Sequence, residues 1–431
     1  MDSKQSPRRR FLKNAAALAG VAVGAIRSAS AHTLGSEIPK VRPKDLHAYG
    51  ERSHFENSGR VGGLGLWPPA AGPIRDYGFR TPLQSSVGII TPASLHFVLS
   101  HGYDPPDIDP RKHRLLIHGM VDRPLIFTMD DLERLPSVSR FHFLECHGNS
   151  ATSGPTGYLR KVPTATVQET HGLTSCSEWT GVPLSLLLQQ AGLQKGASWL
   201  VAEGADAVKH SKSIPLEKAM DDILVAYSQN GEPLRPEQGY PLRLVVPGWQ
   251  GINNVKWLRR IKVVDQPYMS MMESTRYPSP RPDGKSRWFE SAMGPKSVIT
   301  RPSGGQRLPS PGFYEITGLA WSGGGVIRRV EVSTDGGQTW NDANLQEPVA
   351  RKAHTRFGLD WNWDGGEAVL QSRCTDERGE VQPTIAQIGK IWNVDLDYFR
   401  STSPGTVDMG NFNAIQPWKV THDGSIHNAL L

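Results

Sequence analysis

The sequence predicts an α+β domain over residues 81–266 and, after a linker at 267–296, an all-β sandwich domain over residues 297–420. In the first region, short apolar runs alternate with helical patterns. The linker contains the Pro-, Gly- and Ser-rich stretch YPSPRPDGKSRW. Beyond it, short alternating strands are separated by turns rich in Gly and Asp, which is typical of a sandwich.

Residues 1–31 have the features of a twin-arginine export signal. Paired arginines at 8 and 9 precede a weakly apolar run over 14–26, and the small residues ASA stand just before His32. A membrane anchor is the weaker interpretation, because the run is shorter than the ~20 residues needed to span a bilayer. We therefore expect export to the periplasm, with cleavage before His32. Twin-arginine systems export folded proteins, often because a cofactor has been inserted in the cytoplasm. The signal is therefore a first indication of a cofactor.

The charge of the chain is concentrated in this signal. Residues 1–31 carry a net charge of +5 out of a total of +6, which leaves +1 for the remainder. The sequence pI of 9.1 is therefore largely a property of the signal. No nucleic-acid partner is implied.

Local signals in the rest of the chain predict individual elements. Residues 32–80, with GGLGLWPPAAGP at their centre, indicate a loop-rich lead-in. TMDDLERLP predicts a short helix capped by Thr128, and VPLSLLLQQAGL predicts a helix that ends at Gly192. PLRLVVPG and LRRIKVV predict strands around a glycine loop, and TDGGQ predicts a hairpin in the β domain.

The three cysteines, Cys146, Cys176 and Cys374, are too few and too widely spaced for a disulfide framework. No C-x-x-C-H sequence is present for covalent c-type haem, and no paired C-x-x-C for zinc or an iron–sulfur cluster. We expect Cys176 and Cys374 to be buried, inert thiols.

In RFHFLECHGNS, residues 140–150, the aromatic, strand-like part ends at Cys146, and Gly148 follows two residues later. Free cysteine is commonly a small buried residue, so packing alone is one interpretation. The flanking His142 and His147 make a zinc site conceivable, but a second ligand pair is missing. The pattern by itself leaves packing and ligation open.

A second cluster lies in EQGYPLRLVVPGWQGINNVKWLRRI, residues 237–261. Arg243 and Lys256 stand close in sequence to Gly248 and Gly251. Fixed cations beside glycines that permit close approach are what a phosphate or pyrophosphate group requires. The alternative is a hairpin with surface cations.

Together with CSEWTGVPLSLLL, KSIPLEKAMDDILVAYSQNGEPLRPEQGYP and AWSGGGVIRRVEVSTDGGQTW, these motifs resemble the sulfite oxidase family of molybdenum enzymes over about residues 80–420. Within it they are most similar to the molybdenum subunits of periplasmic sulfane dehydrogenases of the sulfur-oxidising (Sox) system. The resemblance implies a molybdopterin-binding α+β domain of the sulfite oxidase fold, followed by an immunoglobulin-like dimerisation domain. It also implies one molybdenum–molybdopterin cofactor per chain and a homodimer.

The resemblance assigns roles to individual residues. Cys146 becomes a thiolate ligand of molybdenum, a soft donor that tunes the metal's potential. Gly148 lets the loop lie against the pterin. Tyr277 becomes an active-site donor or proton relay, and Arg356 an arginine that the β domain contributes to the anion pocket. The implied cofactor contacts are Phe97, His101, Cys146, Asp206, Gln238, Arg243, Asn254, Val255 and Lys256, with Arg243 and Lys256 on the pterin phosphate.

Two positions depart from the family pattern. Leu99 stands where sulfite oxidases place an arginine that helps to bind sulfite, and Gln238 replaces a cofactor-contacting histidine. Losing a cation should weaken the binding of a small free dianion. We therefore expect the substrate to be a sulfur chain, with free sulfite secondary, unless Arg160 or Arg276 supplies the missing charge.

The resulting expectation is oxidation of sulfite or protein-bound sulfane sulfur, with a sulfur-carrier protein as a candidate substrate. Because the chain has no haem motif, electrons would pass to a separate c-type cytochrome. Two alternatives stay open: a molybdopterin-dependent reductase of an oxidised sulfur or nitrogen substrate, and a non-catalytic binding protein on the same fold. Neither a nucleic-acid partner nor a membrane span is expected.

Overall fold

The computed structural model describes residues 52–53, 55–62, 77–100, 104–150, 159, 161–280, 283–288, 292–400 and 411–430. The chain divides into two units, Met1–Glu56 and Asn57–Leu431, and every element below belongs to the second. The predicted export signal, most of the lead-in and His101 lie outside the described residues.

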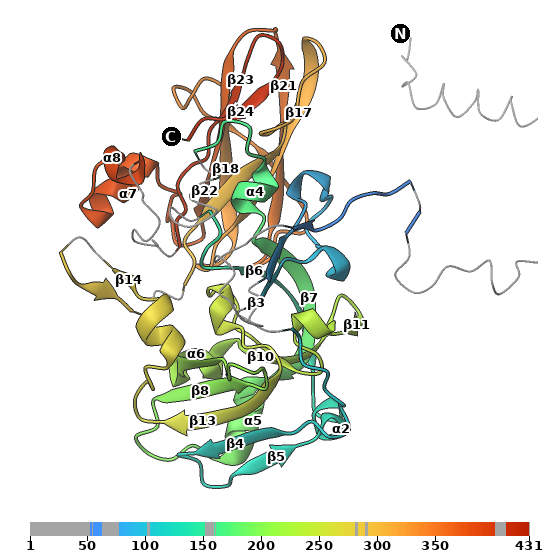
Figure 1. The fold of residues 1–431 in the computed structure, drawn as a ribbon, viewed down its shortest axis with the longest axis vertical. Helices are drawn as coiled ribbons and strands as arrows, with labels where there is room; N and C mark the ends of the chain where they lie inside the picture. The colour runs from blue at the N-terminus through green and yellow to red at the C-terminus, as the bar shows by residue number, and fades with distance from the viewer. Residues whose placement is uncertain are drawn as a thin grey trace, which may run out of the picture. The chain divides into compact units, whose positions relative to one another are not determined.

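A mixed five-stranded sheet in the order β5-β4-β13-β8-β9 forms one part of the α+β domain (Figure 1). Strand β13 runs parallel to β4 and antiparallel to β8. The strands are β4 (Leu115–Gly119), β5 (Leu125–Phe127), β8 (Trp199–Gly204), β9 (Ser211–Pro215) and β13 (Leu258–Val264). Helices α5 (Leu184–Ala191) and α6 (Leu216–Asp221) pack against this sheet.

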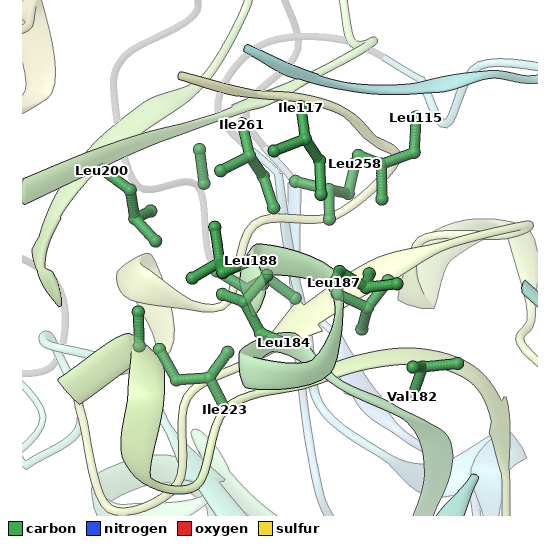
Figure 2. Packing of buried hydrophobic residues seen from close by; sticks show 14 of the residues in the cluster. Leu115, Ile117, Val182, Leu184, Leu187, Leu188, Leu200, Ile223, Leu258 and Ile261 are labelled. Carbon is green, nitrogen blue, oxygen red and sulfur yellow. The ribbon is translucent and has the colours of Figure 1, made fainter. Parts of the chain in front are cut away.

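The core of this layer is aliphatic. Figure 2 shows Ile117 and Ile261 of the sheet facing Leu184 and Leu188 of α5, and all four are fully buried. Burying one such side chain contributes about 1.5–3 kcal/mol. The layer is therefore a rigid base for the loops that leave it.

A second sheet of β6, β7, β10, β11 and β12 carries the candidate site. Its strands are β6 (Val138–Glu145), β7 (Thr174–Pro183), β10 (Leu224–Gln229), β11 (Glu232–Pro233) and β12 (Arg243–Val245). The antiparallel ladder of β6 and β7 ends where Glu145 pairs with Thr174. The ladder thus delivers Cys146, the next residue, to a fixed place at the edge of the sheet.

Short elements complete the α+β region. They are strands β1 (Val61–Gly62), β2 (Tyr77–Arg80), β3 (Val98–Ser100), β14 (Ser279–Pro280) and β15 (Ser286–Arg287), helices α2 (Met129–Glu133) and α4 (Val167–His171), and single turns η2 (Leu83–Ser85), η3 (Ala93–Leu95), η4 (Pro236–Gln238), η5 (Gly251–Asn253) and η6 (Met272–Arg276). Strand β3 pairs with β2, which pairs with β1.

The C-terminal domain is a sandwich of two antiparallel sheets, in the orders β16-β17-β21-β20 and β19-β18-β22-β23-β24. Its strands are β16 (Lys296–Arg301), β17 (Gly312–Trp321), β18 (Ile327–Ser333), β19 (Asn341–Asp342), β20 (Asn344–Gln346), β21 (Thr355–Trp363), β22 (Ala368–Asp376), β23 (Trp418–Val420) and β24 (Ile426–Asn428). The predicted fold class, an α+β domain followed by a β sandwich, is confirmed.

The sandwich region differs from the prediction in two respects. Helices α7 (Ile385–Trp392) and α8 (Leu396–Arg400) stand inside the stretch predicted to be all-β. Helix α7 begins with a capping box of Thr384 and Gln387 and buries Ile388 and Trp392 on one face. Strand β24 also extends the sheet past residue 420.

Several local predictions are confirmed. Thr128 caps α2 in a capping box with Asp131, and Gly192 ends α5 with φ of 73°. The TDGGQ turn lies between β18 and β19, which pair antiparallel. Cys176 and Cys374 are buried free thiols, and burial raises the pKa of Cys176 to about 12.

No helix among the described residues is long and apolar enough to cross a membrane.

The two domains share a core and close backbone contacts. Phe143 of β6 packs in the same apolar cluster as Trp321 and Phe357 of the sandwich. The Phe143 N–H also donates to the Lys352 carbonyl at 3.0 Å. The strand that leads to Cys146 is therefore supported from the β domain as well as from its own sheet.

Candidate active site

A cavity of about 780 Å³, a volume that includes its open mouth, lies beside strands β3, β6 and β12. The loops that follow β8 and β12 also line it. Its lining residues are His96, Phe97, Val98, Leu99, Ser100, Leu144, Cys146, Asp206, Val208, His210, Gln238, Arg243, Gly251, Ile252, Asn254, Lys256, Trp257 and Tyr277. The structure thus gathers most of the predicted site residues, from distant parts of the sequence, around one space.

Cys146 lies in the cavity wall directly after β6, with only 8% of its surface exposed. Its N–H donates to the Leu173 carbonyl at 2.9 Å, and its own carbonyl accepts from the Asn149 N–H at 2.9 Å. Both backbone groups are fixed, so Cys146 lines the cavity from a well-held loop.

A buried arginine lies near this thiol. Burial lowers the pKa of Arg80 to about 10, while the charges of Glu169 and Cys146 oppose that effect. A nearby cation favours the thiolate form of a cysteine, which is the form that binds metals. Sequence reasoning did not identify Arg80, because no local motif surrounds it.

Two glycines beside Cys146 are used differently. A Cβ at Gly251 would meet the Glu145 carbonyl at 3.0 Å and the Cys146 Cα at 3.4 Å. Glycine there lets the loop after β12 approach Cys146 closely. A Cβ at Gly148 would face open space, with no described atom within 4 Å. That space agrees with the predicted place for a bound group against the loop.

Arg243 is almost fully buried, on β12. Its guanidinium stacks 4.8 Å from the centre of the Trp179 ring and donates to the carbonyls of Gln238 and Asn254 at 2.8 and 3.3 Å. Its Nε is buried and has no hydrogen-bond partner among the residues that the structure describes. Burial lowers the pKa of Arg243 to about 9. A bound anion would neutralise the charge of the guanidinium and accept a hydrogen bond from its Nε.

Lys256 holds a second cation in the same wall. Its ammonium donates to the carbonyls of Leu99 and Glu237 at 3.1 and 3.0 Å and lies 4.6 Å from the Trp257 ring centre. Burial, and then the charge of Arg243, lower the pKa of Lys256 to about 7. Two buried cations in one cavity, with the charge of Arg243 disfavouring that of Lys256, indicate a site for a phosphate.

Polar side chains on two loops complete this end of the cavity. Asp206 Oδ1 accepts from the His210 N–H at 3.0 Å, and the His210 ring bonds the Ile252 carbonyl at 3.0 Å. Asn254 accepts from the Val246 N–H at 2.7 Å and donates to the Gln250 carbonyl at 3.1 Å. These bonds tie together the loops that follow β8 and β12.

Phe97 and Gln238 line the same cavity, and the Gln238 carbonyl accepts from Arg243. Gln238 Nε2 donates to the Phe97 carbonyl at 3.0 Å, and the Phe97 ring stacks on His96 at 5.2 Å. Burial lowers the pKa of His96 to about 3, so this ring is neutral. Gln238, the departure from the family pattern, thus links Phe97 to Arg243.

Tyr277 lines the cavity at the end of η6. Its ring centre lies 5.0 Å from that of His147, and the Lys212 ammonium lies 5.9 Å from it. Lys212 and Glu273 form a buried ion pair at 3.8 Å beside this ring. The phenol is thus brought to the cavity that Cys146 lines.

Two predicted site residues are not in the cavity wall. Arg356, on β21, donates to the carbonyls of Gly88 and Ser86 at 2.9 Å each, so its guanidinium joins the β domain to a loop instead. Val255 is fully buried in the core of the first sheet, and its backbone carbonyl accepts from the Leu244 N–H. His101, Arg160 and the side chain of Arg276 lie outside the described residues.

Besides Arg80, three polar residues in or beside the cavity were missed from the sequence. His96 and His210 line the cavity, and Glu145 is fully buried beside Cys146. Glu145 was detectable in principle, since a carboxylate at the end of the apolar run FHFLE must find buried partners.

Two family models match the chain. A model for an oxidoreductase molybdopterin binding domain matches residues 101–272, and one for a Mo-co oxidoreductase dimerisation domain matches residues 288–398. The crystal structure of the sulfane dehydrogenase SoxCD from Paracoccus pantotrophus is similar, with a TM-score of 0.80 and 38% identity, over 91% of this chain and 98% of that chain. The chain belongs to the sulfite oxidase family. It is a molybdenum-cofactor oxidoreductase.

Longer relatives are similar over the same region. The mitochondrial sulfite oxidase of Homo sapiens is 34% identical over 342 residues, which cover 71% of this chain and 59% of that protein. The NADH nitrate reductase of Solanum lycopersicum is 34% identical over 355 residues, which cover 71% of this chain and 37% of that protein. The chain thus matches only part of the length of these relatives.

The cavity of this family member fits a molybdenum–molybdopterin cofactor. No three His, Cys, Asp or Glu side chains of the described residues gather to hold a metal ion. A single thiol donor suits a metal that arrives with its other ligands attached. The buried Arg243 and Lys256 suit the anionic group of such a cofactor. Residues of this chain would thus hold the metal at Cys146 and the phosphate at the two cations.

Proposed function

We propose that this protein is a periplasmic dehydrogenase that oxidises reduced sulfur, as sulfite or carrier-bound sulfane sulfur, and passes electrons to a c-type cytochrome. The observation that carries the proposal is the convergence of Cys146, Tyr277, Arg243 and Lys256 on one cavity. The bound cofactor supplies oxygen-atom transfer coupled to a two-electron change. The chain supplies the binding and orientation described below.

The protein's own groups divide the work by position. Cys146 presents a thiolate from a loop whose backbone is fixed at both N–H and C=O. Arg243 and Lys256 hold the phosphate end of the cofactor, which sets its orientation. Tyr277 places a phenol in the same cavity, where it can donate a hydrogen bond to an oxygen of the reacting group or hold a proton.

The substrate proposal rests on Leu99. This residue lines the cavity, and among the described lining residues the arginine and lysine side chains are those of Arg243 and Lys256, which also bond backbone carbonyls. A free dianion would thus find an apolar side chain where sulfite oxidases provide a cation. This favours a sulfur chain presented by a larger carrier over free sulfite.

The acceptor and the location rest on the sequence and on the relatives. The chain carries no covalent haem motif, so a separate cytochrome would take the electrons. The SoxCD structure is of a sulfane dehydrogenase, which supports sulfur oxidation as the reaction class. The twin-arginine pattern at residues 1–31 supports a periplasmic location.

The decisive experiment measures molybdenum by elemental mass spectrometry, together with sulfite- and sulfane-dependent reduction of cytochrome c. We expect about one molybdenum per chain, and a Cys146→Ser variant that loses activity by more than about a hundredfold. Cys176→Ser is the matched control, because this thiol is buried away from the cavity. Folded, exported protein without molybdenum would overturn the proposal.

A reductase is the second candidate, favoured by the 34% identity to the tomato nitrate reductase. The same assay separates the two when it is run in both directions. Faster turnover with a reduced dye and nitrate or an oxidised sulfur compound than with sulfite or sulfane sulfur and an oxidised dye would favour the reductase. Holoprotein that is inactive in both directions would favour a binding role.

A further inference from the structure

The carboxylate of Glu145 is a buried hydrogen-bond centre directly behind the proposed metal ligand. Glu145 is fully buried and immediately precedes Cys146. Its Oε1 accepts from Asn149 Nδ2 at 2.9 Å and from Lys296 Nζ at 2.5 Å, and its Oε2 accepts from Trp321 Nε1 at 2.7 Å. Three donors thus fix the carboxylate in one orientation.

Asn149 transmits this fixation to the thiol-bearing residue. The Asn149 side-chain amide is bonded to Glu145, its backbone N–H donates to the Cys146 carbonyl at 2.9 Å, and its Oδ1 accepts from the Leu173 N–H at 2.9 Å. The Leu173 carbonyl in turn accepts from the Cys146 N–H. Both backbone bonds of Cys146 thus run through residues that the Glu145 centre holds in place.

Two of the three donors come from the other domain. Lys296 is the first residue of β16, and Trp321 is the last residue of β17. Lys296 also donates to Ser150 Oγ at 3.0 Å, on the loop that follows Cys146. The sandwich domain therefore contacts the thiol loop through charged and polar groups, in addition to their shared apolar core.

A contribution to folding stability alone does not explain why Glu145 and Lys296 form a buried ion pair here. A buried ion pair contributes little net stability compared with apolar residues of similar volume, because both charges lose their hydration. Groups that orient a metal ligand, in contrast, have large effects on the metal's affinity and reactivity. The placement of the pair, one residue from the thiol, is what an orienting role requires.

We propose that Lys296 and Trp321 of the β domain are positioning residues for the Cys146 thiolate, acting through Glu145 and Asn149. The β domain then tunes the metal centre from outside the cofactor-binding domain. This inference rests on the proposed function, because it takes Cys146 to be the molybdenum ligand.

The test compares two variants with two matched controls in the holoenzyme. Trp321→Phe removes one N–H donor and keeps an aromatic ring, and Lys296→Met removes the ammonium. Trp418→Phe is the first control, because the buried Trp418 Nε1 has no partner among the described residues. Lys352→Met is the second, because it breaks a different contact between the domains, the 2.5 Å bond to Asp222.

The readouts are molybdenum content, kcat and KM for sulfite, and the electron paramagnetic resonance spectrum of Mo(V). We expect Trp321→Phe and Lys296→Met to lower kcat by about tenfold or more. KM should stay within about twofold, and the spectrum should change at equal metal content. Both controls should keep the wild-type spectrum. Wild-type spectra in the two test variants, or equal changes in the controls, would overturn the inference.

A second measurement does not depend on the metal. In the metal-free full chain, both test variants should speed the alkylation of Cys146 by iodoacetamide, followed by peptide mass spectrometry. Cys176 and Cys374 report general loosening in the same samples, because both are buried elsewhere. Equal rates for Cys146 in wild type and variants would count against the proposed positioning role of Lys296 and Trp321. A wild-type protein without molybdenum would instead refute the proposed function alone.

Discussion

Arg243 and Lys256 lie in the cavity with hydrogen bonds to neutral oxygens, so their positive charges are only partly compensated. This incomplete compensation agrees with their lowered pKa values, which are about 9 for Arg243 and about 7 for Lys256. Burial is the main cause in both. A site of this kind is prepared for an anion and carries an electrostatic cost until one binds.

That cost predicts a pH dependence of the cofactor-free protein. The folded-state pKa of Lys256 lies near 7, below its ordinary 10.5. Between these values the unfolded chain binds a proton that the folded chain has lost, so stability rises with pH across this window. Lys256→Met should reduce the slope of unfolding free energy between pH 7 and 9 by up to ~1.4 kcal/mol per pH unit.

Urea unfolding at a series of pH values measures this slope. Arg243 and Lys212 are also affected by burial, but both remain in the variant, so the difference between the two proteins isolates Lys256. Lys195→Met, at an exposed lysine, is the matched control and should keep the wild-type slope. A Lys256→Met protein with an unchanged slope would contradict the assignment.

Leu99 carries the prediction on specificity. Replacing it with arginine adds a cation to the cavity wall, where the described cations Arg243 and Lys256 already bond backbone carbonyls and are assigned to the cofactor phosphate. Since a hydrogen bond to a charged group contributes about 1.5–3 kcal/mol, Leu99→Arg should lower KM for sulfite by about tenfold or more. Leu99→Met tests for an effect of shape alone. Steady-state kinetics with an unchanged or raised KM in the arginine variant would exclude this explanation of substrate choice.

At the scale of elements, the structure explains which predictions from sequence were possible. The end of α5 at Gly192 and the cap of α2 at Thr128 follow from local backbone rules, and both were predicted correctly. The parallel pairing of β13 with β4 joins segments about 140 residues apart, and no local signal encodes that choice. Helix α7 was missed because its short amphipathic pattern lies inside a region dominated by strands.

The same distinction applies to the site. Cys146, Arg243 and Lys256 belong to local motifs, whereas two of the three donors that fix Glu145 come from 151 and 176 residues further along the chain. Arg356 was predicted in the anion pocket, but its bonds to Gly88 and Ser86 depend on how the β domain packs. Long-range packing is the part that sequence reasoning could not supply.

Three loops, which contain Gly248, Met293 and Gly323, contact one another through their backbones. Gly323, after β17, donates to the Met293 carbonyl, and the Met293 N–H donates to the Gly248 carbonyl, after β12. A Cβ at Gly323 would meet the Gly248 oxygen at 2.1 Å. Gly323→Ala should therefore destabilise the protein by about 1–3 kcal/mol through overpacking.

Thermal and urea unfolding measure this effect. Gly59→Ala is the matched control, because the nearest described atom to its Cβ, the Asn57 oxygen, lies 4.0 Å away. A Gly323→Ala protein as stable as the Gly59→Ala protein would mean that the loops separate at little cost. The contact would then not hold the two domains together.

At the scale of the whole molecule, the β domain has two distinct relations to the rest of the chain. One is internal: its residues share a core with β6 and reach the loop that carries Cys146. The other follows from the family, since residues 288–398 match a dimerisation domain. A surface used for dimerisation and a surface used for the active site would then lie on one small sandwich.

This arrangement predicts that assembly and stability are coupled. We expect a homodimer of about twice the 47.4 kDa chain mass, or slightly less after removal of the signal, by sedimentation equilibrium. Because association stabilises the folded state by mass action, the melting temperature should rise with protein concentration. The midpoint should also be the same whether unfolding is followed by circular dichroism or by loss of the molybdenum signal, because the β domain supports both the core and the thiol loop. A monomer at micromolar concentration, or a metal signal lost well before the fold, would separate the two roles of this domain.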